Sequence, residues 1–204
     1  MSTRPAPTRA DRQRLARRLE LAERATELLR SKEEALDRER VRLEGYASRS
    51  EAAWRQQWEA ATHELLRARA LGAGSELDRL ATLEGSTTVD TRWRTSMGVA
   101  YPDSIHCEPD GVPSLTSTAA LRTTAHAYER ALDAAAEHAA MSTAVDRLES
   151  ELAATRRRRR AIDERLRPSL QRSIRRLDLQ LDELDREAAL RVRAATAGRT
   201  EVLR

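Results

Sequence analysis

The near absence of helix breakers over long stretches is the feature that most constrains this fold. No proline lies between Pro7 and Pro102, and Gly45 is the only glycine before Gly72. Glycine and proline are the strongest local signals that end regular structure, so residues 8–71 can run as one helix. Such a helix would be roughly 95 Å long at about 1.5 Å per residue. A helix of this length needs a second helix against which to bury its apolar face.

The positions of the breakers divide the rest of the chain. Five of the seven glycines and three of the six prolines lie between Gly72 and Pro113, and Pro168 is the only breaker between Ser114 and Gly198. We therefore predict an all-α chain whose N- and C-terminal arms form a long antiparallel two-helix coiled coil, with a small central insert that contains a short β-hairpin. The predicted segments are a flexible leader (1–7), an N-terminal coiled-coil helix (8–71), the insert (72–116), a C-terminal helical arm (117–197) and a tail (198–204).

The spacing of apolar residues predicts the seam of the coiled coil. Apolar residues in both arms recur at alternating steps of four and three, as the a and d positions of a heptad repeat do. The predicted seam residues are Leu15, Leu19, Ala22, Leu29, Leu36 and Leu43 in the first arm and Leu152, Ile162, Leu177, Leu181, Leu184 and Ala188 in the last. Between Ile162 and Ile174 the step is four, a drift that locally unwinds a left-handed supercoil. Pro168 lies inside this drift, so we expect the helix to bend there without ending.

Local signals predict the ends of these elements. Thr8, with Asp11 three residues later, is typical of a helix N-cap, and Ser117 or Thr118 can cap the returning helix. Gly198 is expected to stop the last helix. Within the insert, β-formers between residues 82 and 95 predict a hairpin or ribbon with a turn available at Gly85.

The remainder of the insert is predicted to be extended and then to turn. Met97, Gly98, Val99 and Pro102 belong to an extended apolar strip that ends at the proline, and residues 109–111 are predicted to form a turn.

Composition limits the classes of protein that fit. Charged residues are 34% and apolar residues 40% of the chain, against about 25% and about 45–50% in average soluble domains. This balance favours long solvated helices over a thick globular core. Cys107 is the single cysteine, which excludes an internal disulfide and fits a reducing compartment. The chain has no signal-peptide pattern and no uncharged apolar run of membrane-spanning length, so we expect membrane association only through partners.

Motifs for catalysis or metal binding are not found. Gly72–Ser75 is followed by Glu76 and lacks the lysine of a phosphate-binding loop, so it is interpreted as a loop between helices. His106 and Cys107 have no second ligand pair at a metal-site spacing. His126 and His138 are interpreted as solvated surface. We predict no catalytic residue, no metal ligand and no cofactor, and hence no enzyme activity in this chain itself.

The five consecutive arginines from Arg156 to Arg160 raise the question of a polyanion partner. Each helical residue turns by about 100°, so five in a row cover the whole circumference. A stripe that follows a nucleic-acid groove would instead repeat at three, four and seven residues. Arg159 also falls at a seam position, where its stem can pack while its charge reaches the edge. The pattern favours a packed helix pair, and an Arg-rich coiled-coil scaffold that binds nucleic acid or another polyanion stays the alternative.

Several segments resemble the D subunit of V/A-type ATPases and ATP synthases. Residues 157–163, followed by Pro168, are similar to the Arg-rich signature in the last helix of that family, and residues 181–193 are similar to its acidic and then basic helix end. Residues 14–32 resemble the family's opening helix. Residues 96–102 resemble its Met-Gly-Val and proline stretch. The matching segments occur in family order and cover most of the chain.

This resemblance implies a non-catalytic rotor shaft that transmits torque between ATP synthesis or hydrolysis in an A/B head and the translocation of protons or sodium by a membrane ring. The implied partners are the A, B and F subunits and the subunit that links the shaft to the ring, without nucleic acid or direct membrane insertion. The implied location is peripheral, at the cytoplasmic face of the membrane. The candidate partner contacts are Arg157, Arg158, Arg159, Arg160, Met97, Gly98, Val99 and Pro102. A free-standing scaffold or membrane-remodelling hairpin is a further alternative.

Overall fold

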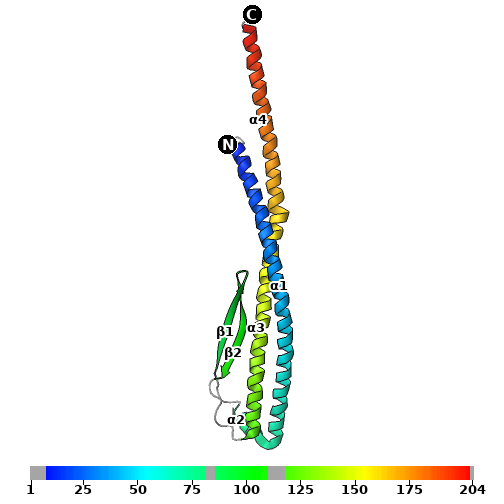
Figure 1. Cartoon of the computed structure of the whole chain (residues 1–204), viewed down its shortest axis with the longest axis vertical. Helices are drawn as coiled ribbons and strands as arrows, with labels where there is room; N and C mark the ends of the chain where they lie inside the picture. The colour runs from blue at the N-terminus through cyan, green and yellow to red at the C-terminus, as the bar shows by residue number, and fades with distance from the viewer. Residues whose placement is uncertain (1–7, 81–85, 110–117, 203–204) are drawn as a thin grey trace. The chain divides into compact units, whose positions relative to one another are not determined.

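The computed structural model describes residues 8–80, 86–109 and 118–202 (Figure 1). In chain order its elements are α1 (Arg9–Ala68), the π-helical segment η1 (Arg69–Ala73), α2 (Gly74–Leu80), β1 (Thr87–Ser96), β2 (Val99–Pro109), α3 (Ala119–Ala161), the π-helical segment η2 (Ile162–Leu166) and α4 (Arg167–Val202). The predicted fold class is confirmed, because long helices α1 and α3 pack together and a two-stranded antiparallel hairpin lies between them in the sequence.

The chain divides into two compact units. The insert unit comprises residues 32–154, and the arm unit comprises residues 1–31 and 155–204. Helices α1 and α3 each pass from one unit into the other.

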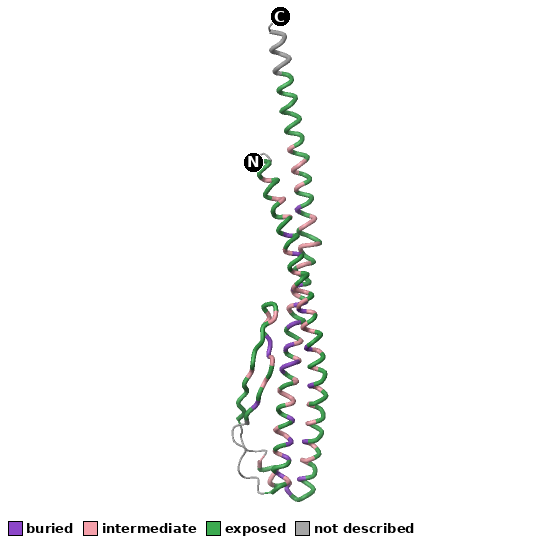
Figure 2. The backbone as a smooth tube through the Cα atoms, in the orientation of Figure 1, coloured by how far each residue is buried: buried purple, intermediate pink, exposed green. Residues whose placement is uncertain are grey.

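The core of the insert unit is the interface between α1 and α3, where buried residues recur along both helices (Figure 2). Because the helices are antiparallel, Leu36 and Leu43, near the start of this unit in α1, cluster with residues 140–152 near its end in α3. The main cluster consists of Leu36, Leu43, Tyr101, Ala140, Met141, Ala144, Leu148 and Leu152. Further along, the cluster of Ala61, Ala127 and Ala131 has only small side chains, which allow a close approach of the two backbones. The interface thus contains the larger leucines around residues 36–43 and 148–152 and small alanines around residues 61 and 127–131.

A glycine ends the first long helix of this unit. Gly72 has a φ of 90°, a conformation that glycine adopts without steric penalty. The turn brings Ala73 and the short helix α2 against Ala68 and Leu121. The interpretation of Gly72–Ser75 as a loop is therefore wrong in part, because Gly72 forms a kink inside η1 and Gly74 is the first residue of α2, a helix that was not predicted from the sequence.

The β-hairpin turns at a different place from the one predicted. Strands β1 and β2 join through Met97 and Gly98, whose φ values of 49° and 82° are the positive values that a type I′ turn requires. The expected extended strip from Met97 to Pro102 is therefore wrong at its first two residues. Gly85, the predicted turn, and residues 110 and 111 lie outside the described residues. Arg92 pairs with Ser104 and Trp93 with Pro102, so Asp103 is an extra residue at a bulge in β2.

The arm unit pairs the beginning of α1 with the end of α3, η2 and α4. Ala22, Thr26, Thr155 and Leu170 are its buried residues among those described. The N-cap at Thr8 is confirmed, because the amide of Asp11 donates a hydrogen bond of 3.1 Å to Thr8 Oγ1. This cap lowers the pKa of Asp11, since the Thr8 hydroxyl donates in turn to the Asp11 carboxylate.

Ion pairs join the two arms beyond these buried residues. Arg9 reaches Asp185 at 3.0 Å and Arg12 reaches Asp178 at 2.9 Å. Helix α4 continues past Gly198 to Val202, so the predicted stop at Gly198 is wrong. A single glycine costs a helix only about 1 kcal/mol, which helical neighbours can offset.

Candidate interaction surfaces

The β-hairpin is fixed to the helix pair through Tyr101. This side chain is fully buried in the core of the insert unit, and its hydroxyl donates a hydrogen bond of 2.5 Å to Glu39 Oε1 on α1. Arg42 holds the same carboxylate with two hydrogen bonds, of 2.7 and 3.0 Å. The hydrogen bond from Arg42 lowers the pKa of Glu39 to about 2 in spite of its partial burial, and Tyr101 adds to this effect. A charged, hydrogen-bonded anchor thus joins β2 to α1.

A second group of contacts joins the hairpin to α3. The guanidinium of Arg147 lies 4.9 Å from the ring centroid of Trp93, within the range of a cation–π interaction. Arg147 Nη1 also donates to the carbonyl oxygen of Ala100 at 3.0 Å. One α3 side chain therefore contacts both strands of the hairpin.

The four predicted contact residues of the insert have different environments. Met97 and Gly98 form the exposed tip of the hairpin, whereas Val99 is half-buried against the main core cluster. Pro102 is buried. The tip is therefore exposed, whereas Pro102 is not.

The wide turn η2 is the irregular feature of the arm unit. Here the amide of Arg167 donates to the carbonyl of Ile162, five residues back, in place of the usual four. Pro168 follows directly and has no amide hydrogen to donate, and its ring would clash with the carbonyl of residue 164 in a regular helix. A π-helical turn relieves this conflict, and such turns are common sites of kinks. Helix α4 goes on after Pro168, as predicted.

Asp163 ties this wide turn to α1. Its carboxylate lies 3.1 Å from Arg167 Nη1 and 3.4 Å from Arg159 Nη1, and the Thr26 hydroxyl of α1 is 3.4 Å away. Arg167 also reaches Glu23 of α1 at 3.4 Å. The Arg167 contacts oppose the effect of burial and hold the pKa of Asp163 below its ordinary value. Asp163 was not among the predicted site residues, although an aspartate flanked by arginines four residues to either side is a recognisable helical pattern.

The arginines that were predicted to contact a partner belong to the arm unit. Arg157, Arg158 and Arg160 are exposed. Arg159 differs, because only 25% of its side chain is exposed and it pairs with Asp163. Its half-buried place agrees with its seam phase in the sequence.

The predicted seam residues show a gradient of burial. Ala22, Leu36, Leu43 and Leu152 are buried. Six others are half-buried, namely Leu15, Leu19, Leu29, Ile162, Leu177 and Leu181. Leu184 and Ala188, near the end of α4, are exposed.

Two pairs of aromatic rings lie in one part of the α1–α3 interface. His138 is stacked on Trp54 at 5.7 Å, and Trp58 meets Tyr128 edge-on at 6.0 Å. His138 is half-buried and lies 3.4 Å from Ser50 Oγ, so its interpretation as solvated surface was wrong. Trp54 and Trp58 are four residues apart in α1, and the ring of each contacts an aromatic side chain of α3.

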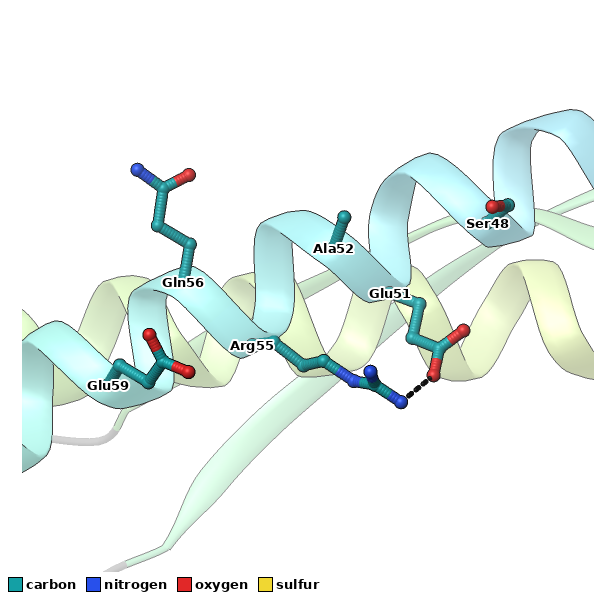
Figure 3. Close-up of a pocket in the computed structure, with 6 residues that line it drawn as sticks. All are labelled: Ser48, Glu51, Ala52, Arg55, Gln56 and Glu59. Carbon is teal, nitrogen blue, oxygen red and sulfur yellow. Dashed lines mark hydrogen bonds and ion pairs between the residues drawn. The ribbon is translucent and has the colours of Figure 1, made fainter.

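A groove of about 430 Å³ lies on the outer side of α1 (Figure 3). All its lining residues, Ser48, Glu51, Ala52, Arg55, Gln56 and Glu59, come from this one helix. Arg55 donates to Glu51 at 2.5 Å along its side. Because the groove has no opposite wall, it cannot enclose a small molecule. Within the described residues no group of three or more metal-binding side chains comes together, and no helix there is long and apolar enough to cross a membrane.

The comparisons with known proteins agree in pointing to one family. The sequence model of the ATP synthase D-subunit family matches residues 11–197. The D subunit of the A-type ATP synthase of Pyrococcus horikoshii is 26% identical over 198 residues, covering 94% of this chain and 92% of that protein. The corresponding protein of Pyrococcus furiosus is 29% identical over 201 residues with the same coverage, and that of Haloquadratum walsbyi is 26% identical over 194 residues, covering 92% of this chain and 84% of that protein. The chain belongs to the ATP synthase D-subunit family.

Proposed function

We propose that this chain is the central rotor shaft of a V/A-type ATP synthase or ATPase. In this role it transmits torque between nucleotide chemistry in a head of A and B subunits and ion translocation by a membrane ring. The observation that carries the proposal is the family match over residues 11–197, which includes both helical arms and the hairpin. The chain itself performs no bond chemistry in this role.

The contacts between the arms support this role mechanically. A shaft has to resist twisting, and two helices joined laterally resist it better than one. In the arm unit the helices are joined by Arg9 to Asp185 and Arg12 to Asp178, and in the insert unit Lys32 pairs with Glu151 at 2.8 Å. These pairs lie outside the buried seam and add lateral contacts between the two helices.

The partners in this proposal are the A, B and F subunits and the subunit that links the shaft to the membrane ring. The exposed hairpin tip at Met97 and Gly98 and the exposed arginines of the arm unit are the proposed contact surfaces. The chain is then a peripheral component at the cytoplasmic face of the membrane, held there by its partners. A polyanion-binding scaffold is not favoured, since both arms lie within the family match.

Co-expression with the A, B and F subunits of the same organism tests the proposal. We expect a stoichiometric complex that hydrolyses ATP and in which a bead attached to this chain rotates. The proposal would be contradicted if A and B subunits assembled into a complex that did not include this chain, even when the chain was supplied in excess. An assembled complex that hydrolyses ATP while the bead on this chain does not rotate would contradict it as well.

A further inference from the structure

The first strand of the β-hairpin, β1, is a long edge strand. Eight of its ten residues are exposed, whereas β2 contributes Tyr101, Pro102 and Cys107 to the buried residues (Figure 2). The sheet has two strands, and within the described residues no backbone hydrogen bond joins β1 to a segment other than β2. An edge strand of this kind presents a row of N–H and C=O groups that can pair with another chain.

The register identifies the residues whose backbone groups point away from β2. Ser96 and Val99 flank the two-residue turn, and a turn of this type joins them by a hydrogen bond. Hydrogen-bonded and non-bonded pairs alternate along an antiparallel ladder, so the next pair, Thr95 with Ala100, is non-bonded. The carbonyl oxygen of Ala100 agrees with this, because it accepts a hydrogen bond from Arg147 of α3.

The same alternation continues along β1. Trp93 lies opposite Pro102, which has no amide hydrogen and therefore suits a non-bonded pair. The extra residue of the bulge lies in β2, so β1 keeps its own alternation through this point. The amides of β1 that point outward are those of Val89, Thr91, Trp93 and Thr95.

One face of β1 offers apolar side chains to a neighbouring strand. Side chains alternate between the faces of a strand, so Val89 and Trp93 lie on the same face. They are 56% and 55% exposed. Apolar side chains of an added strand could bury both of them as cross-strand neighbours.

The other face of β1 is charged. Arg94 on this face pairs with Asp103 of β2 at 3.2 Å. Arg92 is exposed and has no ion pair with another described residue. Asp90, the next residue on this face, is also exposed. An acidic side chain directly opposite Arg92 would therefore complement the edge at this position, whereas a basic one would be repelled.

We propose that β1 pairs through this edge with an extended segment of another protein. Main-chain hydrogen bonds with the outward amides supply affinity, and side chains supply specificity. The added segment carries apolar residues beside Val89 and Trp93 and an acidic residue opposite Arg92. This interaction goes beyond the proposed function, which assigns only the tip of the hairpin to partners, and it does not depend on the rotor role.

A synthetic peptide tests the proposal on the full chain alone. The probe alternates threonine and valine over about nine residues, the length of an ordinary strand, with glutamate at the central threonine position. The control peptide has lysine in place of the glutamate. Peptide affinity is measured by NMR titration, and the same spectra give the hydrogen exchange of each amide of β1.

The pattern of amide exchange reports directly on the edge. In the free chain the outward amides should exchange at least about tenfold faster than the inward amides of Asp90, Arg92 and Arg94. Saturating glutamate peptide should slow the outward amides at least about tenfold and leave the inward ones unchanged. The glutamate peptide should bind at least about threefold more tightly than the lysine peptide, and Arg92→Glu should reverse this preference.

A proline variant tests the main-chain hydrogen bonds. Thr91→Pro removes one outward amide hydrogen and leaves the ladder to β2 intact, so we expect at least about tenfold weaker peptide binding. Thr91→Val is the matched control, because it keeps the amide and a side chain of similar size, and it should bind as wild type does. Unchanged exchange of the inward amides shows that the hairpin persists in each variant. Arg92→Glu tests the edge without a change in the backbone.

Three results would overturn the proposal. One is slow exchange of the outward amides in the free chain, which would show that the edge is already covered. Another is the absence of peptide binding at about 1 mM, or binding that leaves the outward amides unprotected. The third is protection that grows with protein concentration without peptide, which would assign the edge to a second copy of this chain. None of these results involves the A/B head, so the rotor role stands or fails separately in the co-expression experiment.

Discussion

Tyr101 of β2 donates its hydroxyl hydrogen to Glu39 of α1 across 2.5 Å, and this bond joins the only sheet of the described residues to the first long helix. The two residues are 62 positions apart in the chain. Arg42 completes the group from the next turn of α1, and Arg147 fixes the same hairpin from α3. The hairpin is therefore held to both helices by polar and aromatic contacts around one buried ring.

Replacing Tyr101 with Phe should lower the free energy of unfolding by about 1.5 kcal/mol, the low end for a hydrogen bond to a charged group. The low end is expected because Glu39 keeps its bonds to Arg42. Urea denaturation measures the change. Tyr46→Phe is the control, since Tyr46 is exposed and its contacts with Arg42 and Arg49 use the ring face, so its effect should stay within about 0.5 kcal/mol. Equal effects of the two substitutions would refute the role of the Tyr101 hydroxyl.

The depressed pKa of Glu39 predicts a stability that depends on acid. Arg42 first, and then Tyr101, stabilise the charged form in the folded state and lower the pKa from 4.5 to about 2. The folded-state pKa lies below the unfolded one, so this contribution is present above pH 4.5 and is lost as the pH falls toward about 2. Glu39→Gln should therefore flatten the stability profile in this window. A profile of the variant as steep as that of wild type would show that other carboxylates dominate the acid response.

The two long helices could be predicted because their signals are local and repeated. Leu36 and Leu43 lie seven residues apart in α1, Leu152 belongs to the seam predicted in the last arm, and all three are buried. The position of the hairpin turn could not be predicted from local preference, because Met97 is an unusual residue at positive φ and Gly85 offered a more ordinary turn. Pairing of β1 with β2 decides the turn, and that pairing is a property of two strands and not of one segment.

The contacts that fix the hairpin and the wide turn are also non-local. Neither the bond from Tyr101 to Glu39 nor the approach of Thr26 to Asp163 has a counterpart in sequence spacing. Tertiary pairing therefore supplies what periodicity leaves open.

Two glycines should respond in opposite ways to substitution by alanine. Gly45 lies on the exposed side of α1, where a Cβ would meet no atom within 4 Å, so Gly45→Ala should stabilise the chain by about 0.5–1 kcal/mol through helix propensity. Gly98 has a φ of 82° in the hairpin turn, so Gly98→Ala should destabilise it by about 1 kcal/mol. Thermal unfolding of the two variants gives the signs directly. A stabilising Gly98→Ala would contradict the type I′ turn.

Asp163 should contribute to stability through the pairing of the arms. Asp163→Asn removes the negative charge that faces Arg159 and Arg167, and we expect a loss of about 1–2 kcal/mol. Asp182→Asn, an exposed site later in α4, is the matched control and should change stability by less than about 0.5 kcal/mol. A double-mutant cycle with Arg167→Gln isolates the pair. Additive effects in that cycle would show that the two side chains do not stabilise each other.

Pro168 is predicted to bend the last helix, and in the proposed rotor this bend makes the shaft push differently on successive catalytic interfaces. Pro168→Ala restores an amide hydrogen and removes the ring that conflicts with the carbonyl of residue 164. The wide turn at Ile162–Leu166 can then relax to an ordinary helix, with slower amide exchange in this segment. In the assembled complex we expect weaker coupling between ATP hydrolysis and rotation, measured from bead rotation and ATP turnover on the same preparation. Unchanged coupling together with slower amide exchange would show that the wide turn forms because of Pro168 but does not serve torque transmission.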